Sequence, residues 1–204
     1  MSCMRLTKQK LERFYIKNKK SSAEIAKYFN CSEHKVNYWL EKHNISKRSI
    51  SEAIYARHNP RGDPFKIYKP LKIEDAKLWG LGLGLYWGEG NKLNKYGIRL
   101  GNTDPNLIKR FIEFLISFYG INPVKTRFGL QIFSDISPIK ALNFWLRHLG
   151  VSKSQFQKII VTKSRGLGTY NKKMRHGVLT VQYYNKKLRD IIINDLKYFN
   201  FGDF

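Results

Sequence analysis

The sequence predicts an α+β protein in which a small three-helix domain precedes a larger domain of helices packed on a small antiparallel sheet. Three observations support this class. Residues 7–44 carry the capping residues and apolar spacing of three short helices. Residues 45–72 hold three prolines and an excess of basic residues, which is typical of a linker. Residues 73–204 alternate between helical and strand-like apolar patterns.

The composition indicates a folded protein with a polyanionic partner. The chain has 204 residues, of which 42% are hydrophobic and 14% aromatic, enough to bury a core. Its 38 basic and 15 acidic residues give a net charge of +23, spread along the whole chain. A lysine-rich surface that only aids solubility is one interpretation. An excess this large more often indicates nucleic acid, and a membrane surface is the lesser alternative.

The sequence argues against several classes of protein: those built on cysteine metal sites or disulfides, secreted proteins and membrane proteins. Its two cysteines have neither metal-ligand spacing nor the number for a disulfide framework. No signal peptide opens the chain, and the apolar run at 78–88 is shorter than the about 20 residues of a membrane span. We therefore expect a soluble intracellular protein of the cytoplasm or nucleoid, with neither a membrane nor a small-molecule substrate among its partners.

We expect a helix-turn-helix domain over residues 1–50, followed by a basic linker over 51–72. The spacing of Ala26, Asn30 and Val36 is similar to the helix-turn-helix pattern, with asparagine in the left-handed turn position. A three-helix bundle that binds protein is the alternative. In the DNA-binding interpretation the third helix enters the major groove of double-stranded DNA. The residues expected to contact DNA there are His34, Lys35, Asn37, Tyr38 and Lys42.

The stretch at 78–90 is the most unusual in the second domain, which we place at 73–204. Its leucines alternate with glycine, as in a buried strand, but Gly80, Gly84 and Gly88 recur every four residues, which places them on one face of a helix. Interior glycines cost a helix roughly 1 kcal/mol each relative to alanine. A bare stripe offsets that cost by letting another backbone approach closely. We favour the helix, with Gly90 ending it in a left-handed conformation.

Residues 82–90, read as G-L-G-L-Y-W-G-E-G, resemble the LAGLIDADG motif of homing endonucleases, although Trp87 replaces an acid of the motif core. The run at 86–91, followed by Asn102-Thr-Asp-Pro105, also looks like a group that joins a helix-turn-helix to a LAGLIDADG-like domain. In that family two motif helices pack together, and the acid near the motif's end holds a divalent metal at the scissile phosphate.

The resemblance implies a homodimer, since one motif is present, with Gly80, Gly84 and Gly88 at its interface. It implies that Glu89 is both the metal ligand and a catalytic residue, with Mg²⁺ or Mn²⁺ as cofactor. A basic residue near the phosphate would assist, and Lys163 is the candidate we name.

The remaining pattern predicts a strand at 96–103, a helix at 105–119, a strand at 124–133, a helix at 138–149, strands at 156–163 and 177–184, and a last helix from Asn185. The family's domain runs helix, two strands, helix, two strands, helix. Either 91–95 is a short first strand and Gly129 starts a new one, or the chain is elaborated after Gly150.

The strand at 124–133 alternates one apolar face with one basic face, as expected of a sheet that lies on DNA. The basic loop at 164–177 is either a solvated hairpin tip or a phosphate-contacting loop. The residues expected to contact DNA in this domain are Arg99, Lys125, Arg127, Gln131, Arg165, Lys172, Lys173 and Arg175.

The function expected from these features is metal-dependent, site-specific cleavage of DNA by a homodimer. A non-catalytic DNA-binding transcriptional regulator on the same fold is the alternative, and a role on RNA is a third. A regulator has no chemical need for the carboxylate of Glu89, so this residue discriminates between the first two.

Overall fold

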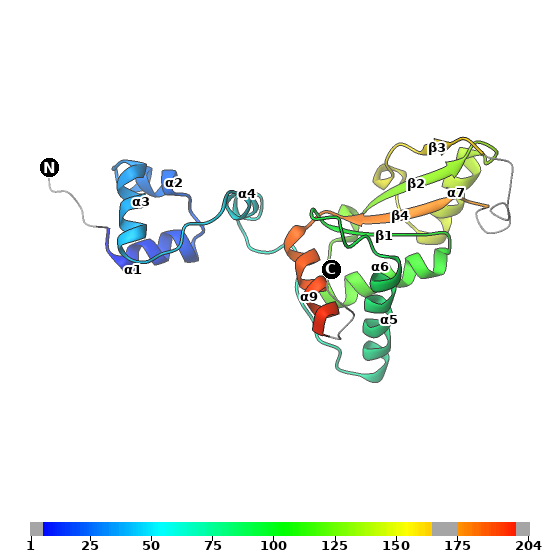
Figure 1. Ribbon diagram of the computed structural model, residues 1–204, viewed down its shortest axis with the longest axis horizontal. Helices are drawn as coiled ribbons and strands as arrows, with labels where there is room; N and C mark the ends of the chain where they lie inside the picture. The colour runs from blue at the N-terminus through cyan, green and yellow to red at the C-terminus, as the bar shows by residue number, and fades with distance from the viewer. Residues whose placement is uncertain (1–5, 165–174, 199–204) are drawn as a thin grey trace. The chain divides into compact units, whose positions relative to one another are not determined.

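The structure is a computed structural model and describes residues 6–164 and 175–198 (Figure 1). Contacts within the chain divide it into two compact units, Met1–Asp63 and Pro64–Phe204, and each is described by itself. The division falls inside the segment 51–72 that we expected to be a linker. In the described part of the chain, no helix has the length and apolar character needed to cross a membrane.

The first unit is a bundle of short helices. α1 (Lys8–Leu11) continues as a π-helix (Glu12–Lys17) and is followed by α2 (Ser22–Tyr28) and α3 (Glu33–Lys42). The hydroxyls of Thr7, Ser21 and Ser32 accept hydrogen bonds from the backbone amides of the first turns. The helices enclose a core of Leu6, Leu11, Tyr15, Ile25, Ala26, Val36, Leu40 and Ile45.

The turn between α2 and α3 and the segment after α3 complete this unit. Asn30 has a φ of 47°, which confirms that asparagine takes the left-handed conformation in the turn. After α3, the guanidinium of Arg48 lies 4.2 Å from the centre of the Tyr15 ring and donates to the carbonyl of Lys19 at 2.9 Å. The unit therefore extends past residue 44, where its helical pattern ends.

The segment expected to be a linker is more structured than its composition predicted. It contains α4 (Ile50–His58), which is capped by Ser49 and buries none of its side chains. Further on, Phe65 is buried in the core of the second unit. The amide of Lys66 donates to the carbonyl of Tyr119 at 3.0 Å. Residues near 65 therefore belong to the second unit, because an extended chain can hydrogen-bond to the exposed carbonyls at a helix end.

The second unit is built on a four-stranded sheet in the order β1-β4-β2-β3, formed by β1 (Ile98–Asn102), β2 (Arg127–Phe133), β3 (Ile160–Thr162) and β4 (Val178–Tyr183). β4 pairs antiparallel with β1 and β2, whereas β2 and β3 are parallel. The expectation of an antiparallel sheet was therefore wrong at one edge. A helix connects β2 to β3, and such a crossover returns the chain in the same direction.

Helices cover one face of this sheet, and within residues 6–164 and 175–198 no helix covers the other, which we call the open face. The covering helices are α5 (Ile73–Glu89), α6 (Pro105–Tyr119), α7 (Pro138–Leu149) and α9 (Lys186–Tyr198) (Figure 1). Their apolar faces and the inward residues of the strands share one core, which includes the fully buried Phe111, Phe114 and Trp145. Gly120 and Gly150 end α6 and α7 with φ of 51° and 64°, directly after the helix ranges 105–119 and 138–149 predicted from the sequence.

Among the residues that the structure describes, the elements of the second unit follow the order read from the sequence: helix, strand, helix, strand, helix, two strands, helix. Residues 91–95 do not form a first strand, because only Gly90 makes a single bridge, to Leu100. Nor does Gly129 start a new strand, since it lies inside β2. The elaboration after Gly150 is the alternative that the structure supports: the chain there adds β3 alongside β2.

Candidate carboxylate site and nucleic-acid interface

The glycine-rich stretch is a helix, so the strand interpretation was wrong. α5 buries Gly82, Leu83 and Tyr86 against the core. At Gly82 an added Cβ would lie 2.1 Å from Cγ of Phe114, so this glycine lets α5 approach α6 closely. At Gly80, Gly84 and Gly88 an added Cβ would meet nothing within 4 Å. The stripe that we assigned to a dimer interface is thus a face that no other described residue of the chain covers.

The C-terminus of α5 is formed differently from our expectation. Gly90 has φ −76° and ψ 140°, which is extended and not left-handed. Glycine is needed there because a Cβ would lie 2.3 Å from both the ring and the carbonyl oxygen of Tyr86. The bridge from Gly90 to Leu100 brings the end of α5 to the β1 edge of the sheet. Glu89, one residue earlier, is therefore presented at that edge.

Glu89 is exposed, and among the described residues no hydrogen bond or ion pair engages its carboxylate. The described residues also contain no group of three or more His, Cys, Asp or Glu that could hold a metal ion. Hard divalent cations take six or more oxygen ligands, or keep several waters. One carboxylate from one chain fits such an ion only if a second chain, a phosphate or water supplies further oxygens.

The open face of the sheet carries polar side chains in rows. β2 alternates as predicted, with Phe128, Leu130 and Ile132 buried on the helix side. Register places Arg99, Gln182 and Arg127 in one row across β1, β4 and β2. The next row is Gly101, Thr180 and Gly129, and a third pairs Val178 with Gln131. The glycines beside Thr180 leave room for neighbouring side chains, since a Cβ at Gly129 would lie 3.1 Å from Nε2 of Gln182 and a Cβ at Gly101 3.2 Å from Oγ1 of Thr180.

Sequence reasoning missed an amide cluster on this face, formed by Gln157, Gln182 and Tyr184. Gln182 donates through Nε2 to Oε1 of Gln157 at 3.4 Å, and Gln157 donates through Nε2 to the Tyr184 hydroxyl at 3.2 Å. The Tyr184 hydroxyl in turn donates to Oε1 of Gln182. The polar positions Thr180 and Gln182 alternate with apolar neighbours in β4, and this was the available signal.

The structure distributes the predicted DNA-contact residues of this unit unevenly. Arg99 is half-exposed on the open face, and Gln131 donates to Oγ1 of Thr162 at 3.1 Å. Arg127 bonds to the carbonyls of Val124 and Thr126 at 2.8 and 3.0 Å, which holds its guanidinium near the start of β2. The other positions differ in kind: Lys125 lies in a 3-10 turn and not in the strand, Arg175 is exposed before β4, and Arg165, Lys172 and Lys173 lie outside the described residues.

Lys163 does not lie beside Glu89 within one chain. It follows β3, at one edge of the sheet, whereas Glu89 lies at the β1 edge. Three interstrand spacings separate these edges, or about 14 Å. Arg99 lies nearer to Glu89, because its carbonyl accepts a hydrogen bond at 2.8 Å from the amide of Asn91, two residues after Glu89. Strand order, which cannot be read from local patterns, decides this separation.

The outer face of α3 presents most of the residues predicted for it. His34, Tyr38 and Lys42 are exposed, and Nζ of Lys42 lies 5.7 Å from the centre of the Tyr38 ring. Lys35 is half-buried. Asn37 is half-buried too, and its Oδ1 accepts from Oγ of Ser22 at 3.0 Å. Its amide is therefore oriented by α2 before any ligand arrives.

These surfaces are the exposed carboxylate Glu89, the open sheet face and the outer face of α3. All three lie on helices and strands that the sequence predicted. No protein-family model, curated protein or solved structure matches the chain.

Proposed function

We propose that the protein is a homodimeric, site-specific DNA endonuclease that uses a divalent metal, as its resemblance to LAGLIDADG proteins suggests. The observation that carries the proposal is the end of α5. There an exposed carboxylate, Glu89, closes a helix whose outer face of Gly80, Gly84 and Gly88 has nothing within 4 Å of the missing Cβ positions.

The glycine face supports a second copy of the chain as its partner. Each interior glycine destabilises a helix by roughly 1 kcal/mol relative to alanine. Gly82 recovers this through contact with Phe114, whereas the stripe has no such contact with the described residues of its own chain. A two-fold axis through the stripe gives each α5 the same close backbone approach from its partner. It also brings the two Glu89 carboxylates near each other.

Two facing carboxylates disfavour joint ionisation unless a cation lies between them. Glu89 from each copy would hold Mg²⁺ or Mn²⁺ together with phosphate oxygens and water. When bound, such an ion lowers the pKa of its water and stabilises the leaving 3′ oxygen. Arg99, on the strand beside Glu89, is the better placed basic residue for the phosphate, and Lys163 becomes a contact at the far edge of the sheet.

DNA binding is proposed for two surfaces. α3, with the rest of a helix-turn-helix, presents His34, Tyr38 and Lys42 to base edges and phosphates. The open sheet face presents Arg99, Arg127 and Gln131, whereas Gln182 between the two arginines is buried. Arginine and glutamine are the side chains that pair bidentately with guanine and adenine. The net charge of +23 suits the polyanion.

A non-catalytic DNA-binding regulator is the second candidate. The N-terminal unit favours it, because a three-helix bundle with an exposed polar helix is a complete DNA-binding surface that needs no metal. Dimer, charge and sheet face serve a regulator equally well.

The test is a nicking assay with the full chain on a duplex selected from a random pool by binding to the protein itself. We expect cleavage with Mg²⁺ or Mn²⁺ and none with EDTA. Glu89→Gln should keep the fold, the dimer and DNA binding but lose cleavage. The matched control is Glu74→Gln, the same change at the other, exposed end of α5. Wild-type protein that binds but never cuts the duplex leaves the regulator as the function.

A further inference from the structure

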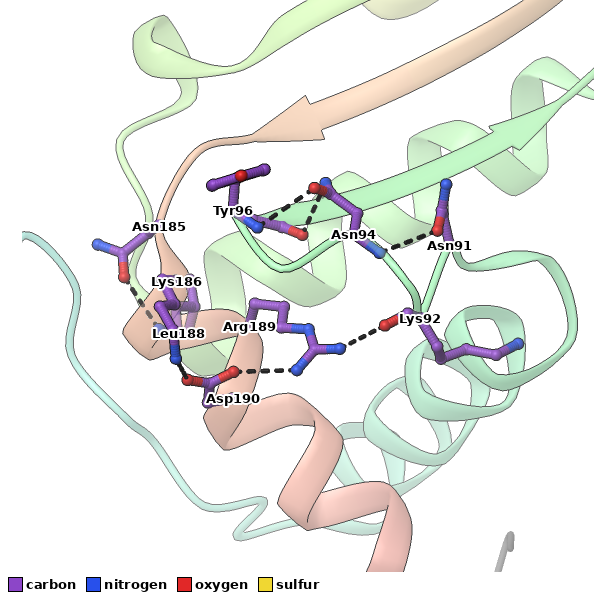
Figure 2. Close-up of polar contacts among 10 residues, drawn as sticks. Asn91, Lys92, Asn94, Tyr96, Asn185, Lys186, Leu188, Arg189 and Asp190 are labelled. Carbon is purple, nitrogen blue, oxygen red and sulfur yellow. Dashed lines mark hydrogen bonds and ion pairs between the residues drawn. The ribbon is translucent and has the colours of Figure 1, made fainter. Parts of the chain in front are cut away.

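The loop that follows Glu89 is held by a side chain from the last helix. Nη2 of Arg189, in α9, donates to the carbonyl oxygen of Lys92, which lies 97 residues earlier in the chain (Figure 2). Nη1 of the same guanidinium donates to Oδ1 of Asp190 at 3.0 Å. The Arg189 side chain is only 16% exposed. Lys92 is three residues after Glu89, so this hydrogen bond acts directly on the segment that leaves α5.

The loop is otherwise held mainly by its own residues. Asn91 Oδ1 accepts from the amide of Asn94 at 3.1 Å, and Asn94 Nδ2 donates to the carbonyl of Gly97 at 3.1 Å (Figure 2). The amide of Asn91 is bonded to Arg99 of β1. These contacts set the shape of the loop. The Arg189 hydrogen bond adds a tie between the loop and a helix of the core.

Arg189 itself is fixed in position. Asn185 Oδ1 accepts from the amide of Leu188 at 2.9 Å and thereby caps the first turn of α9. Leu188 and Ile192, on either side of Arg189, are fully buried. Asp190 also pairs with Lys186, so the carboxylate that orients the guanidinium is itself held (Figure 2). A rigid donor therefore meets the Lys92 carbonyl.

The positive charge of Arg189 also acts on the C-terminus of α5. Burial raises the pKa of the Tyr86 hydroxyl to about 12, and the positive charge of Arg189 acts on the same group in the opposite sense. Tyr86 lies in the last turn of α5, so the Arg189 charge is near the end of that helix. Helix C-termini carry partial negative charge, and an anion such as Glu89 is unfavourable there unless a cation compensates.

We propose that Arg189 is a positioning residue for Glu89: its hydrogen bond to Lys92 and its charge fix the end of α5, and α9 thereby becomes part of the catalytic framework. This inference rests on the proposed function. A carboxylate that shares a metal with its symmetry mate must be held within about 0.5 Å of the productive geometry. The Glu89 side chain makes no hydrogen bond or ion pair in the described part of the chain, so its position depends on the backbone that carries it.

The experiment compares Arg189→Met and Arg189→Lys in the full-length protein, with Arg110→Met as control. Arg110 is an exposed arginine paired with Glu113 on α6, so its loss removes a charge and an ion pair away from the loop. Arg189→Met should keep the dimer and the KM for the selected duplex. Its kcat should fall about 10- to 100-fold, with a higher Mg²⁺ concentration needed for half-maximal cleavage, as for other residues that orient metal ligands. Arg189→Lys should recover part of this, because lysine can still donate to the Lys92 carbonyl.

Hydrogen exchange of the wild type and the same variants gives a readout independent of cleavage. The amides of Asn91 and Asn94 should exchange faster in Arg189→Met than in wild type, with the strand amides of β1 unchanged; Arg110→Met should show neither effect. Unchanged loop exchange overturns the inference, and so does faster exchange with kcat and the Mg²⁺ dependence intact. Wild-type protein that never cuts DNA overturns the proposed function instead, and the exchange result then shows whether Arg189 holds the loop.

Discussion

Gly82 packs directly on the ring of Phe114, so closely that a Cβ at this position would lie 2.1 Å from Cγ of the phenylalanine. Gly84, two residues later on the same helix, meets nothing within 4 Å. Two glycines that look equivalent in the sequence therefore have different structural roles. Gly82 serves the contact between α5 and α6 within the chain, and Gly84 lies on the face that we propose for dimerisation.

Substitution by alanine should separate these roles. Gly82→Ala forces the Phe114 ring and α6 apart, and overpacking of this kind costs about 1–3 kcal/mol of unfolding free energy. Gly84→Ala meets no clash in the single chain and should improve the helix by up to about 1 kcal/mol. Denaturant unfolding of both variants at low protein concentration, where the monomer predominates, measures the difference.

The dimer should respond to a larger residue at the same position. Gly84→Leu should block close approach of two α5 helices, so light scattering should report a monomer where the wild type is a dimer. If the variant keeps the mass of a dimer, the stripe is not the interface. A wild type that stays monomeric at high concentration, both free and on DNA, would exclude the homodimer itself.

On α3, affinity and sequence preference should depend on different residues. Lys42→Ala in the full chain should weaken binding to all duplexes alike. It should also reduce the slope of the logarithm of the binding constant against the logarithm of the salt concentration by about one. Tyr38→Ala should change which duplexes are preferred, because side chains on the outer face of the helix reach base edges. Binding curves at several salt concentrations measure both. Lys109→Ala, on α6 and so on the helix side of the sheet, is the control and should leave both properties unchanged.

The hydrogen bond between Tyr119 and Asp195 should contribute to stability. The Tyr119 hydroxyl donates to Oδ2 of Asp195 at 2.8 Å and ties α6 to α9. Tyr119→Phe leaves the half-buried carboxylate without this donor, and losses of this kind cost about 1–3 kcal/mol. Asp195→Asn keeps an acceptor for Tyr119 and should cost much less at pH 7. Equal losses in the two variants would contradict this assignment.

The same pair predicts a pH dependence. Burial raises the pKa of the Asp195 carboxyl, and the Tyr119 hydrogen bond opposes the shift. The folded state then binds this proton more tightly than the unfolded state. The contribution to stability is complete below the ordinary pKa of about 4 and is lost as the pH rises through the folded value. The wild type should therefore lose stability from pH 4 to pH 7 through this group, and Asp195→Asn should not. Thermal melts of both proteins across this range measure the difference.

His176 should act in the opposite direction. Its ring stacks on Phe144 with centroids 3.6 Å apart, and burial, with His148 and Arg175 nearby, lowers its pKa. The unfolded state binds this proton more tightly, so the contribution is complete above about pH 6.5 and is lost as the pH falls through the folded value. His176→Gln should flatten the decline in melting temperature between pH 7 and pH 5.

The sequence by itself determined most of the helices and the described order of elements in the second unit, but neither α4 nor the extended conformation of Gly90 at the end of α5. Capping residues such as Ser32 and Asp104, and glycines such as Gly120 and Gly150, act on backbone groups within one turn. Apolar periodicity likewise reflects neighbours a few residues apart, as the buried Phe128 and Leu130 of β2 show. Such local interactions leave a readable pattern in the chain.

Only the tertiary structure decided which residues meet across the fold. It made β3 parallel to β2, placed Lys163 and Glu89 at opposite edges of the sheet, and brought Arg189 to the carbonyl of Lys92. It also separated Gly82, packed on Phe114, from the glycine stripe. The physical reason is the same in each case. Strand order and helix packing follow from burying one shared core. Residues that meet only through that core have no fixed separation in the sequence, so no local pattern predicts their contact.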